Sequence, residues 1–153
     1  MKKWVAFLVL LGVCWSSLGC RQVTPRGADE ILCDYMARQD SLPAGVIYRA
    51  GAAEGEDGYF SAQMMARMYG EEADIRCFSL VEDYAIYLSS FAEPCEIAVL
   101  RCYAKSDCDR IAEMCLARIE TLRIALVGTP YRARADAASV VVEGNLVVMR
   151  LLP

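Results

Sequence analysis

The feature that most constrains the fold is a two-residue turn between two valine-rich runs near the carboxyl end. Residues 139–143 (SVVVE) and 146–149 (LVVM) flank Gly144-Asn145. This pattern predicts a β-hairpin, because a tight glycine-containing turn matches the twist of its two strands. Both runs are continuously apolar and do not alternate. At least one strand is therefore expected to be buried on both faces or to lie centrally in its sheet.

A second hairpin is predicted in the middle of the chain. Residues 84–88 and 96–103 are rich in β-branched and aromatic residues, and the six residues 89–94 connect them. Residues 75–80 fit either an additional strand or an extension of the first strand of this hairpin.

Two shorter helices are predicted before that hairpin. Residues 28–38 place apolar side chains at helical spacing and carry Asp29 and Glu30 in the first turn, where the helix dipole favours acids. Ser61 is a suitable N-cap for a second helix, which runs through residue 68 or 69.

The longest helix is predicted between the two hairpins. It is expected to start at Ser106, with Asp109 three residues later as an acidic approximation of a capping box, and to stop at Gly128 and Pro130. Its buried face is predicted to contain Ile111, Cys115, Arg118 or Ile119, Leu122 and Leu126. The order of elements indicates an α+β fold. We expect a two-layer sandwich whose mainly antiparallel sheet is built from two hairpins separated by one long helix.

The first residues match an export signal. Lys2 and Lys3 precede an uncharged run over residues 4–15, and small residues follow it. The run is shorter than the roughly 20 residues that a membrane crossing needs, and it lacks the polar face of a surface helix. The pattern predicts a cleavable signal peptide over residues 1–19.

Ser17-Leu18-Gly19-Cys20 resembles a bacterial lipobox, in which a small residue precedes the cysteine that receives diacylglycerol. The large aliphatic residue lies two positions before Cys20, whereas a lipobox has it three before, so cleavage by an ordinary signal peptidase is the alternative. We predict lipidation of Cys20, a tether over residues 20–27 and a single domain over residues 28–153. The membrane is then a partner through the lipid anchor. The protein is expected on the extracytoplasmic face of the cell membrane, or secreted if Cys20 carries no lipid.

Composition narrows the function. Without residues 1–19, 14 basic residues face 20 acidic ones, a net charge of −6. This balance argues against nucleic acid as a partner, since phosphate backbones require a basic surface. The sequence contains no histidine, which rules out Ser/His/Asp and Cys/His nucleophilic sites. No cofactor or metal site is predicted. The acidic stretch 51–58 lacks the spacing of an EF-hand loop and is interpreted as a solvated loop.

Six cysteines follow the predicted cleavage point: Cys33, Cys77, Cys95, Cys102, Cys108 and Cys115. They are compatible with buried thiols, with at least one disulfide of an exported protein, or with metal or redox chemistry. Cys108 and Cys115 lie two helical turns apart, about 10 Å, so they cannot pair with each other. Cys102 can reach Cys108 across the predicted strand-to-helix turn.

Several short motifs together resemble the bacterial family called domain of unknown function 4358. These motifs are LPAG (42–45), AEGEDGY (53–59), MYG (68–70), EIAV (96–99) and VEGNLV (142–147). The resemblance extends over essentially all of the chain after the signal. It implies a small exported bacterial protein, often with a lipidation signal, and no assigned activity or catalytic residues.

The function expected from the sequence is a lipid-anchored cell-envelope protein with a non-catalytic binding or accessory domain. Its partner would be an envelope protein or a cell-wall component. One alternative is an envelope enzyme using carboxylates and tyrosine, for which Glu82, Asp83, Glu93 and Glu96 are the candidate acids. Another is an accessory subunit of a membrane assembly that modifies surface polysaccharide.

Overall fold

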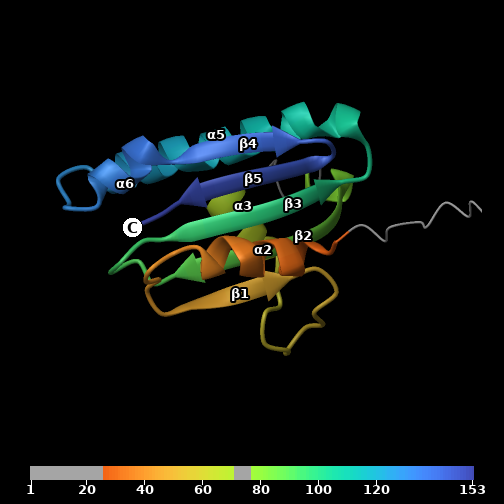
Figure 1. The fold of residues 1–153 in the computed structure, drawn as a ribbon, viewed down its shortest axis with the longest axis horizontal. Coiled ribbons are helices and arrows are strands. Elements are labelled where there is room, and N and C mark those ends of the chain that lie inside the picture. Colours follow the sequence, from red (N-terminus) through yellow and green to blue (C-terminus); the bar gives the residue numbers. More distant parts are fainter. Residues whose placement is uncertain (1–25, 71–76) are drawn as a thin grey trace, which may run out of the picture.

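The computed structural model describes residues 26–70 and 77–153, which contain a five-stranded antiparallel sheet in the order β1-β2-β3-β5-β4. The strands are β1 (Gly45–Arg49), β2 (Val81–Ser89), β3 (Glu96–Cys102), β4 (Ser139–Glu143) and β5 (Leu146–Leu151). The helices are α2 (Ala28–Ala37), α3 (Ala62–Tyr69), α5 (Cys108–Ala125) and α6 (Arg132–Ala137) (Figure 1). The predicted α+β sandwich, with two hairpins separated by one long helix, is confirmed.

Helices pack on both faces of the sheet. Ile86, Leu100 and Met149 point to one face and pack with α3 and α5. Tyr87 and Val99 point to the opposite face and pack with α2. Figure 1 shows α2 crossing in front of the strands while α5 runs behind them. The sheet is therefore covered by α3 and α5 on one side and partly by α2 on the other.

The carboxyl-terminal hairpin explains why its sequence is continuously apolar. β5 lies between β3 and β4, and Val147, Val148 and Met149 are all buried, as predicted for a strand covered on both faces. Gly144 has a φ of 63°, the left-handed value that the first central position of a type II′ turn requires and that glycine adopts without strain. Ser139 pairs with Arg150 and Glu143 with Leu146 across the turn.

Helix α5 buries the predicted face. Ile111, Cys115, Ile119 and Leu122 are buried, and Met114 joins them. The predicted start at Ser106 is wrong, because residues Lys105–Asp107 form a short 3-10 turn and the α-helix begins at Cys108. The helix N-terminus has no side-chain cap. The capping pattern failed because Ser106 lies inside the preceding turn.

Two elements were not predicted. β1 extends the sheet beyond β2, with Gly45 opposite Ser89 and Arg49 opposite Ala85. α6 is a short, arginine- and alanine-rich helix between α5 and β4. β1 has five residues and α6 has six, and elements this short do not show a clear periodicity in the sequence.

The undecided segment 75–80 is resolved in part. Phe78–Leu80 form a 3-10 turn and the strand starts at Val81, while residues 75 and 76 lie outside the described residues. Within residues 26–70 and 77–153, no helix combines the length and the hydrophobicity that a membrane crossing requires.

Candidate functional site

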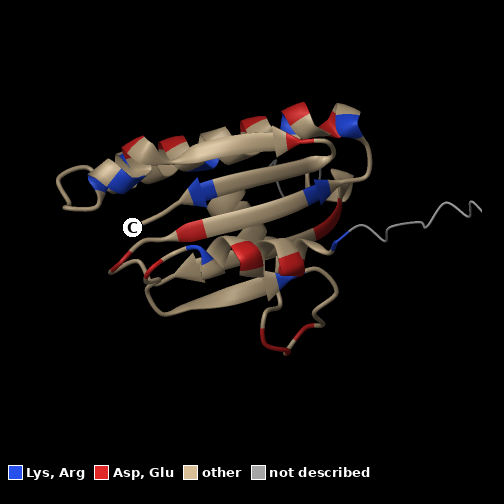
Figure 2. Cartoon of the chain, in the orientation of Figure 1, with Lys and Arg blue, Asp and Glu red and all other residues tan. Residues whose placement is uncertain are grey.

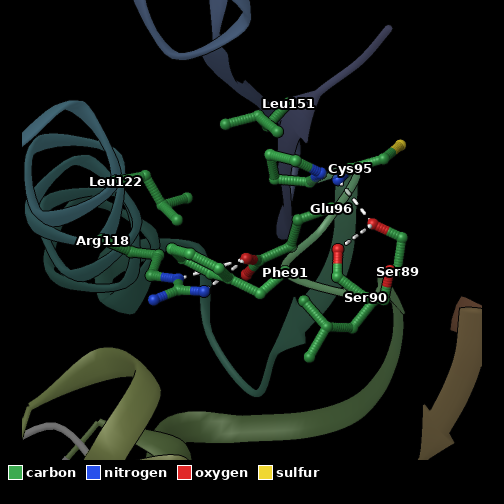
Figure 3. Close-up of a pocket in the computed structure, with 10 residues that line it drawn as sticks. Ser89, Ser90, Phe91, Cys95, Glu96, Arg118, Leu122 and Leu151 are labelled. Carbon is green, nitrogen blue, oxygen red and sulfur yellow. Dashed lines mark hydrogen bonds and ion pairs between the residues drawn. The ribbon is translucent and has the colours of Figure 1, made fainter. Parts of the chain in front are cut away.

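A small pocket opens where the β2–β3 hairpin meets the second half of α5 (Figure 3). Its volume is about 160 Å³. The apolar side chains that line it come from the hairpin, from α5 and from the end of β5, and the polar ones are two serines, a cysteine and an ion pair. The lining residues are Leu88, Ser89, Ser90, Phe91, Pro94, Cys95, Glu96, Arg118, Leu122 and Leu151.

The pocket is lined by the ion pair of Glu96 and Arg118, and a hydrogen bond from Tyr69 connects a third element to this pair. Glu96 at the start of β3 is 1% exposed. Arg118 of α5 donates from Nε and Nη2 to Glu96 Oε2, at 3.1 and 2.9 Å. Tyr69 at the end of α3 donates its hydroxyl hydrogen to Glu96 Oε1 at 3.0 Å. Both carboxylate oxygens are thus hydrogen-bonded, which offsets the cost of burying the charge.

The environment keeps the Tyr69 phenol and the Arg118 guanidinium protonated. Burial, and then the charge of Glu96, raise the pKa of Tyr69 well above its usual value, so the phenol stays protonated. Desolvation lowers the pKa of Arg118, but the charge of Glu96, its hydrogen bond and the nearby Tyr69 together outweigh this and leave the pKa raised. Arg118 therefore stays charged, and neither group exchanges a proton near neutral pH.

The cysteine beside the ion pair is also held protonated. Burial raises the pKa of Cys95 to about 11. Because a thiolate is the reactive form, this thiol is a poor nucleophile at neutral pH. The neighbouring Ser89 hydroxyl is engaged by the backbone, since it accepts from Cys95 N at 2.7 Å and donates to Glu93 O at 2.6 Å. Neither Cys95 nor Ser89 is therefore an activated nucleophile.

The acids predicted as catalytic candidates lie at two ends of the sheet. Glu93 is exposed at the hairpin, 3.6 Å from Arg134 of α6, and Glu96 is buried in the pocket. Glu82 and Asp83 lie at the start of β2, at a separate cleft of about 500 Å³ that Arg101 also lines.

Glu82 and Asp83, at the start of β2, have different environments. Asp83 Oδ2 accepts a hydrogen bond from the backbone N–H of Ala28 at 2.7 Å and so caps the N-terminus of α2. Glu82 is exposed. Asp83 therefore has a structural partner, and the two acids do not form a matched pair.

The other predicted positions fall as follows. Cys20, the predicted lipidation site, lies outside the described residues. The six later cysteines are free thiols, with Cys33 exposed and the other five buried. Within the described ranges, no group of three or more cysteines and acids could hold a metal ion. The acidic residues of the 51–58 loop are exposed, and Figure 2 shows the acidic part of this loop as a red stretch of the chain away from the sheet.

The sequence predicts Glu96 as a candidate acid but does not predict its partners. Arg118 is one of two alternatives for one position on the buried face of the long helix, and Tyr69 is predicted only as the end of a helix. The available signal was an arginine in line with apolar residues on α5, since a cation on a buried face requires an anionic partner. No local pattern indicates which acid that partner is.

No family model, curated protein or solved structure matches the chain. The resemblance to the domain of unknown function 4358 family stays a prediction from the short motifs that carry it.

Proposed function

We propose that this chain is an exported, lipid-anchored protein of the cell envelope, and that its domain is a non-catalytic binding or accessory module. The observation that supports this localisation is the amino-terminal sequence pattern. Two lysines, the uncharged run 4–15 and Cys20 follow one another in the order of a lipoprotein signal. Two acyl chains on Cys20 would anchor the domain stably at the membrane surface.

The chemistry of the pocket supports binding over catalysis. Glu96 is neutralised by Arg118 and hydrogen-bonded by Tyr69, while burial keeps the Tyr69 phenol and the Cys95 thiol protonated. General acid–base catalysis needs a group that titrates near the working pH. The Glu96–Arg118 ion pair, with the protonated Tyr69 and Cys95 beside it, instead forms a rigid surface against which a partner can pack.

The size of the pocket favours a macromolecular partner. Pockets for drug-sized ligands span roughly 300–1,000 Å³, whereas this one has about 160 Å³. Phe91 at its rim is 72% exposed, so an aromatic ring stands at the tip of the hairpin next to a cavity that suits a single side chain. Exposed aromatic residues beside small pockets are typical anchors of protein interfaces. We therefore infer that an envelope protein docks at the β2–β3 hairpin.

The address is tested by incorporation of a labelled fatty acid into the full chain in a bacterial host. Wild type is expected to carry the label, Cys20→Ala to lose it, and Cys33→Ala to keep it as a matched control with an exposed thiol. The two tryptophans, Trp4 and Trp15, precede Cys20, so the processed protein is also expected to lack tryptophan fluorescence. Label retained by Cys20→Ala, or tryptophan emission from the purified protein, would contradict the proposal.

The binding surface is tested by photo-crosslinking in cells. A photoreactive phenylalanine analogue at position 91 is expected to give a discrete crosslinked protein band. The same analogue at Tyr103, a similarly exposed aromatic residue beyond the other end of β3, is the control. Equal crosslinking at both positions, or none at position 91, would reject docking at the hairpin.

A further inference from the structure

Two cysteines meet at the end of the sheet opposite the pocket. Cys102 is the last residue of β3 and Cys108 is the first residue of α5. Both side chains are buried, and the connection between them, residues 103–107, lies largely at the surface. The pair thus lies directly beneath a short exposed segment.

The β4–β5 turn holds both residues in place. The backbone of Cys102 donates from N to Asn145 O at 2.8 Å and accepts from Asn145 Nδ2 at 3.0 Å. Cys108 Sγ lies 3.8 Å from Gly144 O. The two thiols are anchored on neighbouring residues of one turn, and burial together with the nearby Cys108 thiol raises the pKa of Cys102. Both side chains also belong to the same buried cluster.

We propose that Cys102 and Cys108 are a disulfide-forming pair in this protein. Two S–H bonds break, one S–S bond forms, two protons leave, and two electrons pass to a disulfide oxidant, which becomes two thiols. In the cell this oxidant is the disulfide of an envelope thiol oxidoreductase. This inference rests on the proposed function in one respect: an exported protein is in an oxidising compartment. The positions of the two thiols come from the fold alone.

The other cysteines are less well placed. Cys33 is exposed on α2 and Cys95 lies at the opposite end of β3. Cys115 is near enough to Cys102 and Cys77 for their charges to affect it. It is however two helical turns, about 10 Å, further along α5 than Cys108, and so farther from the exposed 103–107 segment. Cys102 and Cys108 flank that segment, and an oxidant reaches them by displacing it.

The test is peptide mapping of the full chain, purified with its thiols reduced. The protein is incubated with oxidised glutathione, the remaining thiols are alkylated, and trypsin is added. Cleavage after Arg101, Lys105 and Arg110 places the two cysteines in separate peptides, CYAK and SDCDR. The expected result is a joined CYAK–SDCDR species, lighter than the sum of the two peptides by two hydrogen atoms, which separates on reduction.

Two kinds of result would overturn the proposal, and two variants serve as controls. Alkylation of both peptides in the oxidised sample, or a dominant link from CYAK to a peptide containing Cys115 or Cys77, would overturn the proposal. Cys102→Ala is expected to abolish the joined species and Cys77→Ala to retain it. The wild-type map stands even if a variant fails to fold. Fatty-acid labelling is scored on separate samples, so failure of the proposed address and failure of the disulfide are told apart.

Discussion

At the scale of single residues, the buried pair of Glu96 and Arg118 carries the largest energetic consequence. The side chains are 2% and 13% exposed, so neither charge is well solvated by water. Such a pair contributes little net stability compared with apolar residues of the same size, but breaking it leaves a charge without a partner in the core. The pair instead ties β3 to α5, and Tyr69 adds α3 to the same contact.

We predict that Arg118→Ala lowers the free energy of unfolding by about 3–5 kcal/mol, because Glu96 remains buried and loses its cation. Arg49→Ala is the matched control, since Arg49 pairs with Asp29 at 2.7 Å but both side chains are nearly half exposed. That change is expected to cost about 0–1 kcal/mol. Urea denaturation of both variants measures the difference, and equal losses would mean that burial of the Glu96 charge is not what matters.

At the scale of elements, α2 depends on a residue from the sheet for its N-terminal cap. The N-cap residue Gly27 has no side chain that could accept a hydrogen bond. Asp83, 55 residues away on β2, supplies the acceptor for Ala28 N. The cap therefore also fixes α2 to the sheet face that it covers.

Asp83→Ala is expected to destabilise the protein by about 0.5–2 kcal/mol, the usual effect of removing a helix cap. It should also speed amide hydrogen exchange in α2 more than in α5. Glu82→Ala, at the exposed neighbouring position, is expected to change neither property. If Glu82→Ala matched Asp83→Ala in stability and exchange, the capping role would be wrong.

At the scale of the whole molecule, the two ends of the sheet have different properties. The hairpin end presents Phe91 and the pocket, while the opposite end holds the buried Cys102 and Cys108 beneath the 103–107 segment. The lipid address depends on Cys20 and the docking surface on the folded domain, so the two experiments are independent. Fatty-acid labelling without crosslinking at position 91 would leave an anchored protein whose partner binds elsewhere. Crosslinking at position 91 without fatty-acid labelling would mean that the domain binds a partner but is not anchored by a lipid on Cys20.

Much of the fold could be predicted because it depends on local patterns. The helices α2, α3 and α5 have apolar residues at helical spacing, and the last hairpin has a turn that few conformations satisfy. The Ser61 cap of α3 is confirmed, with its hydroxyl accepting from Met64 N at 3.2 Å. The candidate site was predicted only in the identity of Glu96.

The sequence by itself determined the class of fold, both hairpins and the burial of β5, because neighbouring residues contain the information for turns and amphipathic faces. Only the tertiary structure decided that β1 joins the sheet, that Asp83 caps α2 and that Glu96 meets Arg118 and Tyr69. These contacts join residues that are 22 to 55 positions apart, or pair whole strands. Their energy depends on burial and geometry that exist only after the chain has collapsed, so no local pattern encodes them.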